Sequence, residues 1–218
     1  MALLLYIDTS SRNCSVCIAD DNRVLASRIQ MDSNSHAQIL ASFIDEVFEE
    51  SGIKREELEA IVVSAGPGSY TGLRIGMSTA KGMCYALGIP LIALDSLENL
   101  ALEMYRQEPN EDAIYIATLD SRKGEIYYAV MDGKQNLVCP STPAIVKDLD
   151  WDKWKSKCVY IGGNTFTKLL DGTFEITLKT ISLTYRAENY LILGSKYFSN
   201  KSFDSLVYKE PNYLKPFQ

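Results

Sequence analysis

The residues best able to do chemistry stand at the end of the first apolar run, in the tetrapeptide Asp8-Thr9-Ser10-Ser11. A carboxylate followed by hydroxyls in a tight turn can hold a phosphate or a magnesium ion. The same residue types also make a purely structural turn, capped by its own side chains. The sequence therefore marks Asp8, Thr9 and Ser10 as a candidate phosphate hairpin and leaves the structural alternative open.

A glycine-rich stretch over residues 64–83, SAGPGSYTGLRIGMSTAKGM, could also cradle a phosphate. It fails the P-loop pattern, because Gly68 and Gly72 enclose three residues instead of four and no Lys-Ser/Thr pair follows. It loosely fits a dinucleotide-binding fingerprint, with Asp95 closing the next apolar run. Three predicted antiparallel strands precede this unit, and that order disfavours a dinucleotide site.

The glycines also recur at helical spacing, which favours packing over phosphate binding. A glycine inside a helix costs about 1 kcal/mol relative to alanine, a cost tolerated where another backbone comes close. The preceding predicted helix carries an apolar band wider than one core contact needs. We expect a partner or dimer interface made of Leu40, Ile44, Val47, Gly72, Gly76, Ala80 and Met83. The alternative is that this stripe packs on the sheet of its own lobe.

Metal ligands are scarce. His36 is the only histidine, and its place at the start of a predicted helix is typical of a capping or packing residue. Cys14 and Cys17 have the spacing of half a zinc site, but on a strand residues three apart face opposite sides. The five cysteines are odd in number and scattered, which indicates free thiols. We expect no metal site.

The elements that must position these residues repeat along the chain. Apolar runs predict strands at 2–8, 14–20, 23–29, 60–64 and 90–94, and helices at 35–51, 72–87 and from 95 or 96 to about 106. Residues 113–120, 126–132 and 136–139 echo the first three strands, with the turn Asp120 to Lys123 matching the first hairpin. The stretch 159–169 echoes residues 62–73. The order predicts an internal duplication.

Composition bounds the function. The 218 residues carry a formal net charge of -6 and a pI near 4.9, with no dense Lys/Arg run, so we expect any nucleic acid to be served through a partner. The longest apolar run is far shorter than the roughly 20 residues that span a bilayer. No charged leader with a small-residue cleavage site opens the chain. We expect a cytoplasmic protein without membrane contact.

Together these features predict an α/β fold of two duplicated lobes, each a mixed sheet flanked by helices, over residues 1–105 and 106–218. This plan resembles the actin, sugar-kinase and chaperone-ATPase superfamily, whose ribonuclease-H-like lobes contact phosphates through their first hairpins. Three segments, YIDTSSRNCSVCI, GPGSYTGLRIG and IPLIALDSLENLA, resemble the bacterial TsaB family. That resemblance covers about the first 105 residues, and the second lobe carries little of it.

The resemblance implies a non-catalytic, dimerising scaffold subunit. It would support a TsaD-like catalytic subunit which, with a TsaE-like ATPase, transfers a threonylcarbamoyl group to the adenosine beside the anticodon of certain tRNAs. TsaD-like relatives hold a metal with two histidines four residues apart, and Ser96 and Leu100 stand at the matching positions here. The phosphate hairpin would then be degenerate, with no firmly bound cofactor. Weak nucleotide binding and a homodimer stay open.

Two alternatives use the same residues differently. An ATP-dependent kinase or hydrolase of the actin-like superfamily would use Asp8 and Thr9 catalytically. A metallopeptidase would need more ligands than the single His36 supplies. Nucleotide turnover by the isolated protein separates the first alternative from the scaffold.

Overall fold

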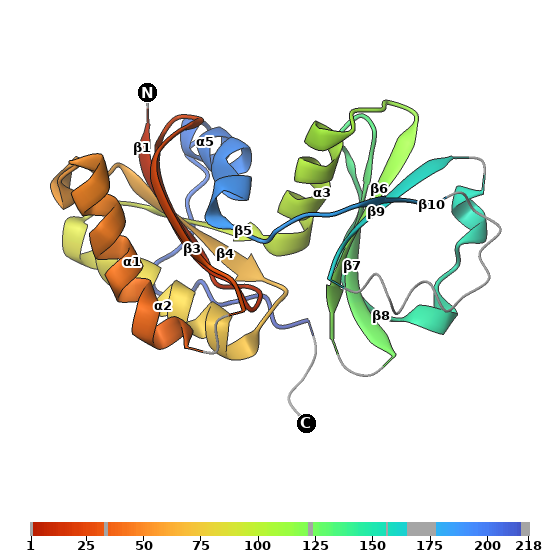
Figure 1. Cartoon of the computed structure of the whole chain (residues 1–218), viewed down its shortest axis with the longest axis horizontal. Coiled ribbons are helices and arrows are strands. Elements are labelled where there is room, and N and C mark those ends of the chain that lie inside the picture. The colour runs from red at the N-terminus through yellow and green to blue at the C-terminus, as the bar shows by residue number, and fades with distance from the viewer. Residues whose placement is uncertain (1, 33–34, 122–123, 156, 165–177, 215–218) are drawn as a thin grey trace. The chain divides into compact units, whose positions relative to one another are not determined.

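The structure is a computed structural model that describes residues 2–32, 35–121, 124–155, 157–164 and 178–214 (Figure 1). The chain forms two compact units, Met1–Ser96 with Tyr185–Asn212 and Leu97–Thr184 with Tyr213–Gln218. The division predicted at residue 105 does not coincide with this one. The helix after Ser96 goes with the second unit, and a late segment returns to the first.

The first unit is built on a mixed sheet of five strands in the order β3-β2-β1-β4-β5. The strands are β1 (Leu3–Asp8), β2 (Cys14–Asp20), β3 (Arg23–Gln30), β4 (Ala60–Gly66) and β5 (Leu91–Asp95). The first three are antiparallel neighbours, whereas β1, β4 and β5 run parallel. β4 is buried along its whole length, as expected of a parallel strand covered on both faces.

Helices α1 (His36–Ser51) and α2 (Tyr70–Leu87) pack on one face of this sheet, and their side chains share one core with Leu5, Ile7, Ile61 and Val63 (Figure 1). α5 (Leu191–Ser199) packs on the opposite face, where a Cβ on Gly194 would meet Tyr6 and Val62. Strand side chains alternate between faces, so neighbouring residues of β1 and β4 serve the two layers.

The predicted ends of the two long helices are close to the observed ones. Gly52, with φ at 70°, ends α1, and its N–H donates to the Phe48 carbonyl at 3.0 Å. Ser69 caps α2, because its Oγ accepts the Gly72 N–H at 3.2 Å. Ser35 stands at the N-cap of α1 but makes no side-chain capping bond.

The second unit repeats the topology, with the strand order β10-β9-β6-β7-β8. Its elements are α3 (Ser96–Gln107), β6 (Ala113–Asp120), β7 (Glu125–Asp132), β8 (Leu137–Ile145), β9 (Cys158–Gly163) and β10 (Leu178–Ile181). Read from β8, the order of antiparallel and parallel neighbours equals that of the first sheet read from β3. The prediction of a duplicated α/β fold is confirmed.

Parts of the predicted repeat lie outside the described residues, namely Arg122, Lys123 and the stretch 165–169. Within the described residues, none of the helices has the length and apolar character needed to cross a membrane.

Candidate functional site

The candidate phosphate hairpin turns the chain between β1 and β2. Two of its backbone N–H groups are hydrogen-bonded, whereas the Thr9 and Ser10 hydroxyl oxygens are buried with no hydrogen-bond partner among the described residues. The Asp8 Oδ1 accepts the Ser10 N–H at 2.9 Å, and the Thr9 N–H donates to Ser64 Oγ at 3.2 Å. Asp8, Thr9 and Ser10 are all buried. A phosphate in this turn would need those two backbone N–H groups, which are already engaged.

The loop after β4 closes over the hairpin. The Ser69 N–H donates to the Ser10 carbonyl at 2.6 Å. A Cβ on Gly68 would lie 2.2 Å from the same carbonyl oxygen, so only glycine allows this approach. The glycine-rich stretch therefore seals the hairpin, and this geometry matches the structural alternative weighed above.

Helix α2 crosses the hairpin at Thr9. A Cβ on Gly72 would lie 2.2 Å from the Thr9 carbonyl oxygen, and one on Gly76 would lie 2.2 Å from Thr9 Oγ1. Both glycines thus serve a close approach within the first unit. The contact between α2 and the hairpin is therefore part of the fold of the first unit and does not depend on a partner.

The side chains of Tyr185 and Tyr190 lie near Asp8, and both are buried. Burial and, after it, the Asp8 charge raise the pKa of both phenols. Burial likewise raises the pKa of Asp8, opposed by its hydrogen bonds to Ser10 and Ser64. Sequence reasoning missed these two tyrosines, because no local motif links a segment near residue 185 to a turn at residue 8.

The predicted interface set faces inward. Leu40, Ile44, Val47 and Ala80 are at most 5% exposed and belong to the core between the sheet and the two helices. Gly72 and Gly76 are buried against Thr9, and Met83 is half-buried beside that core. The expectation that this face is open to a partner is wrong. Helical spacing identifies residues on one face, but the chain's own sheet covers that face.

The opposite face of the α1–α2 pair is the exposed one, and most of its side chains are small or polar. We call it the outer helix face: Ala37, Gln38, Ala41, Ser42, Asp45 and Glu49 on α1, with Thr71, Arg74, Ser78, Gly82, Tyr85 and Ala86 on α2. Unlike Gly72 and Gly76, Gly82 has open space where a Cβ would be. Tyr85, one turn away, is 84% exposed.

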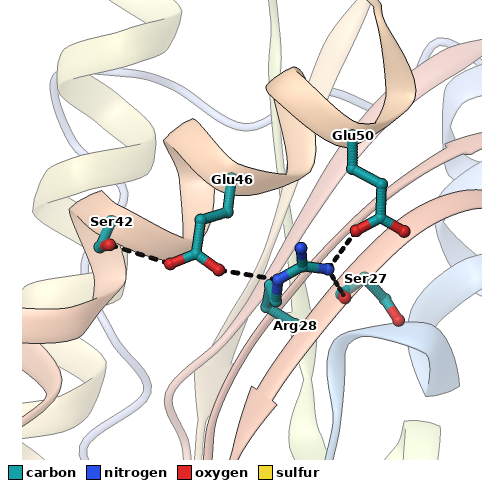
Figure 2. Close-up of polar contacts among 5 residues, drawn as sticks. All are labelled: Ser27, Arg28, Ser42, Glu46 and Glu50. Atoms are coloured by element: carbon teal, nitrogen blue, oxygen red, sulfur yellow. Dashed lines mark hydrogen bonds and ion pairs between the residues drawn. The ribbon is translucent and has the colours of Figure 1, made fainter.

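An ion-pair cluster ties α1 to β3 at the edge of the sheet (Figure 2). The Arg28 Nε donates to Glu46 Oε2 at 2.8 Å, and its Nη1 bonds both Glu50 and the Ser27 carbonyl. Ser42 Oγ donates to the second Glu46 oxygen at 3.0 Å. The cluster lowers the pKa of Glu46, mainly through Arg28, and fixes α1 on its strand.

The thiols and the single histidine have structural surroundings. Cys14 packs in the core beneath α1, while Cys17 lies near residues 186–188 on the other side of β2. Burial raises the pKa of Cys14 to about 12, which makes its thiol unreactive. His36 is nine-tenths buried, and its Nε2 donates to the Asn13 carbonyl at 3.1 Å. Among the described residues no group of three or more metal-ligating side chains is present.

Ser96 and Leu100, the positions matched to histidines in TsaD-like relatives, are both buried. Their side chains supply no imidazole, so these positions cannot hold a metal as a histidine pair would.

Comparison with known proteins places these features in a family context. The family model described as TsaD, tRNA N6-adenosine threonylcarbamoyltransferase, matches residues 24–170. The tRNA threonylcarbamoyladenosine biosynthesis protein TsaB of Bacillus subtilis is 30% identical over 167 residues, covering 74% of this chain and 71% of that protein. Its Escherichia coli namesake is 25% identical and covers 97% of this chain and 94% of its own length.

Two solved structures have a fold similar to that of this chain. A crystal structure from Pseudomonas aeruginosa, described as an uncharacterized protein with similarity to the peptidase YeaZ, is 25% identical with a TM-score of 0.87. The alignment covers 99% of this chain and 100% of that one. The ethanolamine utilization protein EutJ from Carboxydothermus hydrogenoformans, at 12% identity, a TM-score of 0.53 and coverage of 88% and 90%, shares the fold alone.

Proposed function

Since this chain belongs to the TsaB family of tRNA threonylcarbamoyladenosine biosynthesis proteins, we propose that it is a non-catalytic scaffold that binds and supports a TsaD-like catalytic subunit. A TsaE-like ATPase would complete the complex, and tRNA would be reached through these partners. The net charge of -6 supports the proposal that the partners contact the tRNA, because a protein that binds RNA on its own usually presents a basic surface.

The sealed hairpin supports the non-catalytic role. Its carboxylate is 2% exposed and accepts the Ser10 N–H, so a metal-bound phosphate could reach Asp8 only if the groups that cover it moved away. The kinase or hydrolase alternative would require Gly68 and the first turn of α2 to withdraw from Ser10 and Thr9. We propose accordingly that the hairpin is degenerate and that no cofactor is firmly held.

We propose that the TsaD-like subunit docks on the outer helix face, and Gly82 is the observation that carries this proposal. A glycine inside a helix costs about 1 kcal/mol relative to alanine. Gly72 and Gly76 offset that cost through their contact with Thr9, but none of the residues that the structure describes fills the space beside Gly82. A partner backbone could lie against that point only because Gly82 has no side chain, since small residues let helix axes approach each other.

Size-exclusion chromatography and co-purification with a tagged TsaD-like subunit test the docking surface. Gly82→Arg should abolish co-purification without lowering the melting temperature of the free chain, since the arginine would project into solvent there. Ser199→Arg, which adds the same charge at an exposed position of α5, is the matched control and should co-purify normally.

Retained co-purification of Gly82→Arg would overturn the proposed surface. Chromatography of the chain alone, before and after the same substitution, reports in parallel whether a homodimer uses this face.

A further inference from the structure

The three most exposed large apolar side chains among the described residues all belong to the first unit. Tyr85 on α2 is 84% exposed, and Val207 and Tyr208 near the end of the chain are 75% and 85% exposed. The other exposed large apolar side chains reach at most 50%. We call Tyr85, Val207 and Tyr208 the apolar patch. Apolar side chains that gather at one place on a surface, and are not scattered singly, mark interaction sites.

Lys81 brings the two parts of the apolar patch together. Its Nζ donates to the Val207 carbonyl at 3.3 Å and to the Lys209 carbonyl at 3.1 Å. Tyr85 follows Lys81 by four residues on α2, so these two side chains are neighbours on one side of the helix. The helix residue and the two residues from the late segment therefore flank the same lysine.

The turn over residues 205–209, which carries Val207 and Tyr208, is fixed from two sides. Lys81 ties it to α2. Asp204 ties it to β5, because its Oδ2 accepts the Ala93 N–H at 2.8 Å while its Oδ1 pairs with the Lys209 Nζ at 3.1 Å. A turn whose backbone is already fixed loses less conformational entropy when a partner binds, so these exposed side chains are pre-organised for binding.

The apolar patch continues the outer helix face around α2. At 3.6 residues per turn, Tyr85 lies about 60° around the helix axis from Gly82 and about 40° from Lys81, between the two. Tyr85 already belongs to the outer helix face, and Lys81 anchors the 205–209 turn beside it. A partner that covers Gly82 and extends over Tyr85 would therefore meet the turn next.

The charges around the apolar patch favour a protein partner over a nucleic acid. Lys81 is bonded to two carbonyls and Lys209 is paired with Asp204, so the two lysines that border the patch are engaged within the chain. Nucleic-acid binding depends on positive charge that is available to phosphates. Tyrosine, in contrast, is enriched among the residues that contribute most to protein–protein binding.

We propose that the 205–209 turn is part of the docking surface for the TsaD-like subunit. Tyr85, Val207 and Tyr208 contact that subunit, and Lys81 is a positioning residue that holds the turn against α2. This inference rests on the proposed function, because it assigns the same partner to the surface beside Gly82.

The test is the Kd of the full chain for the tagged TsaD-like subunit, measured by biolayer interferometry. Val207→Ser/Tyr208→Ser should weaken binding at least tenfold and leave the melting temperature unchanged, because both side chains are exposed in the free chain. Leu137→Ser/Val138→Ser is the matched control, since it changes two adjacent apolar residues of β8 that are 39% and 49% exposed. It should leave the Kd unchanged.

Lys81→Met separates positioning from direct contact, because it removes both hydrogen bonds to the turn and keeps an unbranched apolar side chain. We expect it to weaken binding in the wild-type background and to have no further effect in Val207→Ser/Tyr208→Ser. An equal effect in both backgrounds would overturn the role assigned to Lys81.

Wild-type affinity of Val207→Ser/Tyr208→Ser would overturn the proposal. If Gly82→Arg still fails to bind in the same assay, the proposed function stands without this extension. The proposal is also wrong if Val207→Ser/Tyr208→Ser keeps its affinity for the TsaD-like subunit but loses self-association in chromatography, or tRNA retention in a gel shift. The apolar patch would then belong to a second copy of the chain or to RNA.

Discussion

Replacing Gly76 with alanine should destabilise the protein, whereas the same change at Gly82 should stabilise it. Both glycines lie inside α2, so both substitutions gain about 1 kcal/mol of helix propensity. At Gly82 the new methyl group enters open space. At Gly76 it would approach Thr9 Oγ1 to 2.2 Å, with the Thr9 Cβ and Cγ2 at 3.4 and 3.5 Å.

Relieving this contact requires the Thr9 side chain to turn its Hβ toward the new methyl group, and Thr9 is fully buried, so both γ atoms would have to find new places within the packed turn. Overpacking of a core costs about 1–3 kcal/mol. Net of helix propensity, Gly76→Ala should lose about 1 kcal/mol, while Gly82→Ala should gain up to about 1 kcal/mol. For a chain of this size each kcal/mol moves the melting temperature by about 2–4 °C.

The assay is a thermal melt of both variants, together with Thr9→Ala and the double variant Thr9→Ala/Gly76→Ala. Trimming Thr9 removes both γ atoms, so the double variant should be more stable than the sum of its singles by about 1–2 kcal/mol. A rise in melting temperature for Gly76→Ala, or strict additivity in this cycle, would refute the claim that α2 is locked on the hairpin.

Three further predictions concern ionisation and hydrogen bonding. Burial raises the folded-state pKa of Asp8 above its usual 3.8, so its contribution to stability is most favourable in acid and falls as the pH rises through that raised value. The wild type should therefore lose stability relative to Asp8→Asn as the pH rises from about 4 to 7. If the difference between their free energies of unfolding in urea melts does not change with pH, this reasoning is wrong. Arg28→Gln should lower the melting temperature slightly in dilute buffer, with the difference vanishing near 1 M NaCl, where the screening length is about 3 Å; a difference that persists in salt would mean that the cluster acts through packing. Tyr115→Phe should cost about 1 kcal/mol, because the Tyr115 hydroxyl donates to the Glu108 carbonyl inside the second unit, and an unchanged urea midpoint would show that this bond adds nothing.

Hydrophobic periodicity was sufficient to predict the duplicated fold, because most strands and helices of the two units show a recognisable pattern within a short window. It did not predict β10 or α5. The unit boundary could not be read in this way. Met104 of α3 packs beside Gly162 of β9, and the Ala93 N–H donates to Asp204 Oδ2 at 2.8 Å. Such long-range contacts assign α3 to the second unit and residues near 204 to the first, and no local pattern encodes them.

The site was half predictable for a similar reason. The residues of the hairpin identified it as a polar turn, but its seal depends on how close Gly68 and Gly76 come to Ser10 and Thr9. Likewise, spacing placed Leu40 and Ala80 on one face without saying that the chain's own sheet covers it. The glycine that matters for docking under our proposal, Gly82, differs from Gly76 only in what surrounds it.

The central claim is that this chain acts through its outer helix face and not through the hairpin. Its most direct test is the rate of threonylcarbamoyl transfer to tRNA, reconstituted with a TsaD-like subunit and a TsaE-like ATPase, for the wild type, Asp8→Asn and Gly82→Arg. We predict that Asp8→Asn stays within a few-fold of the wild type and that Gly82→Arg is inactive. A loss above about a hundredfold in Asp8→Asn, equivalent to about 2.7 kcal/mol at the barrier, together with full activity of Gly82→Arg, would contradict the account.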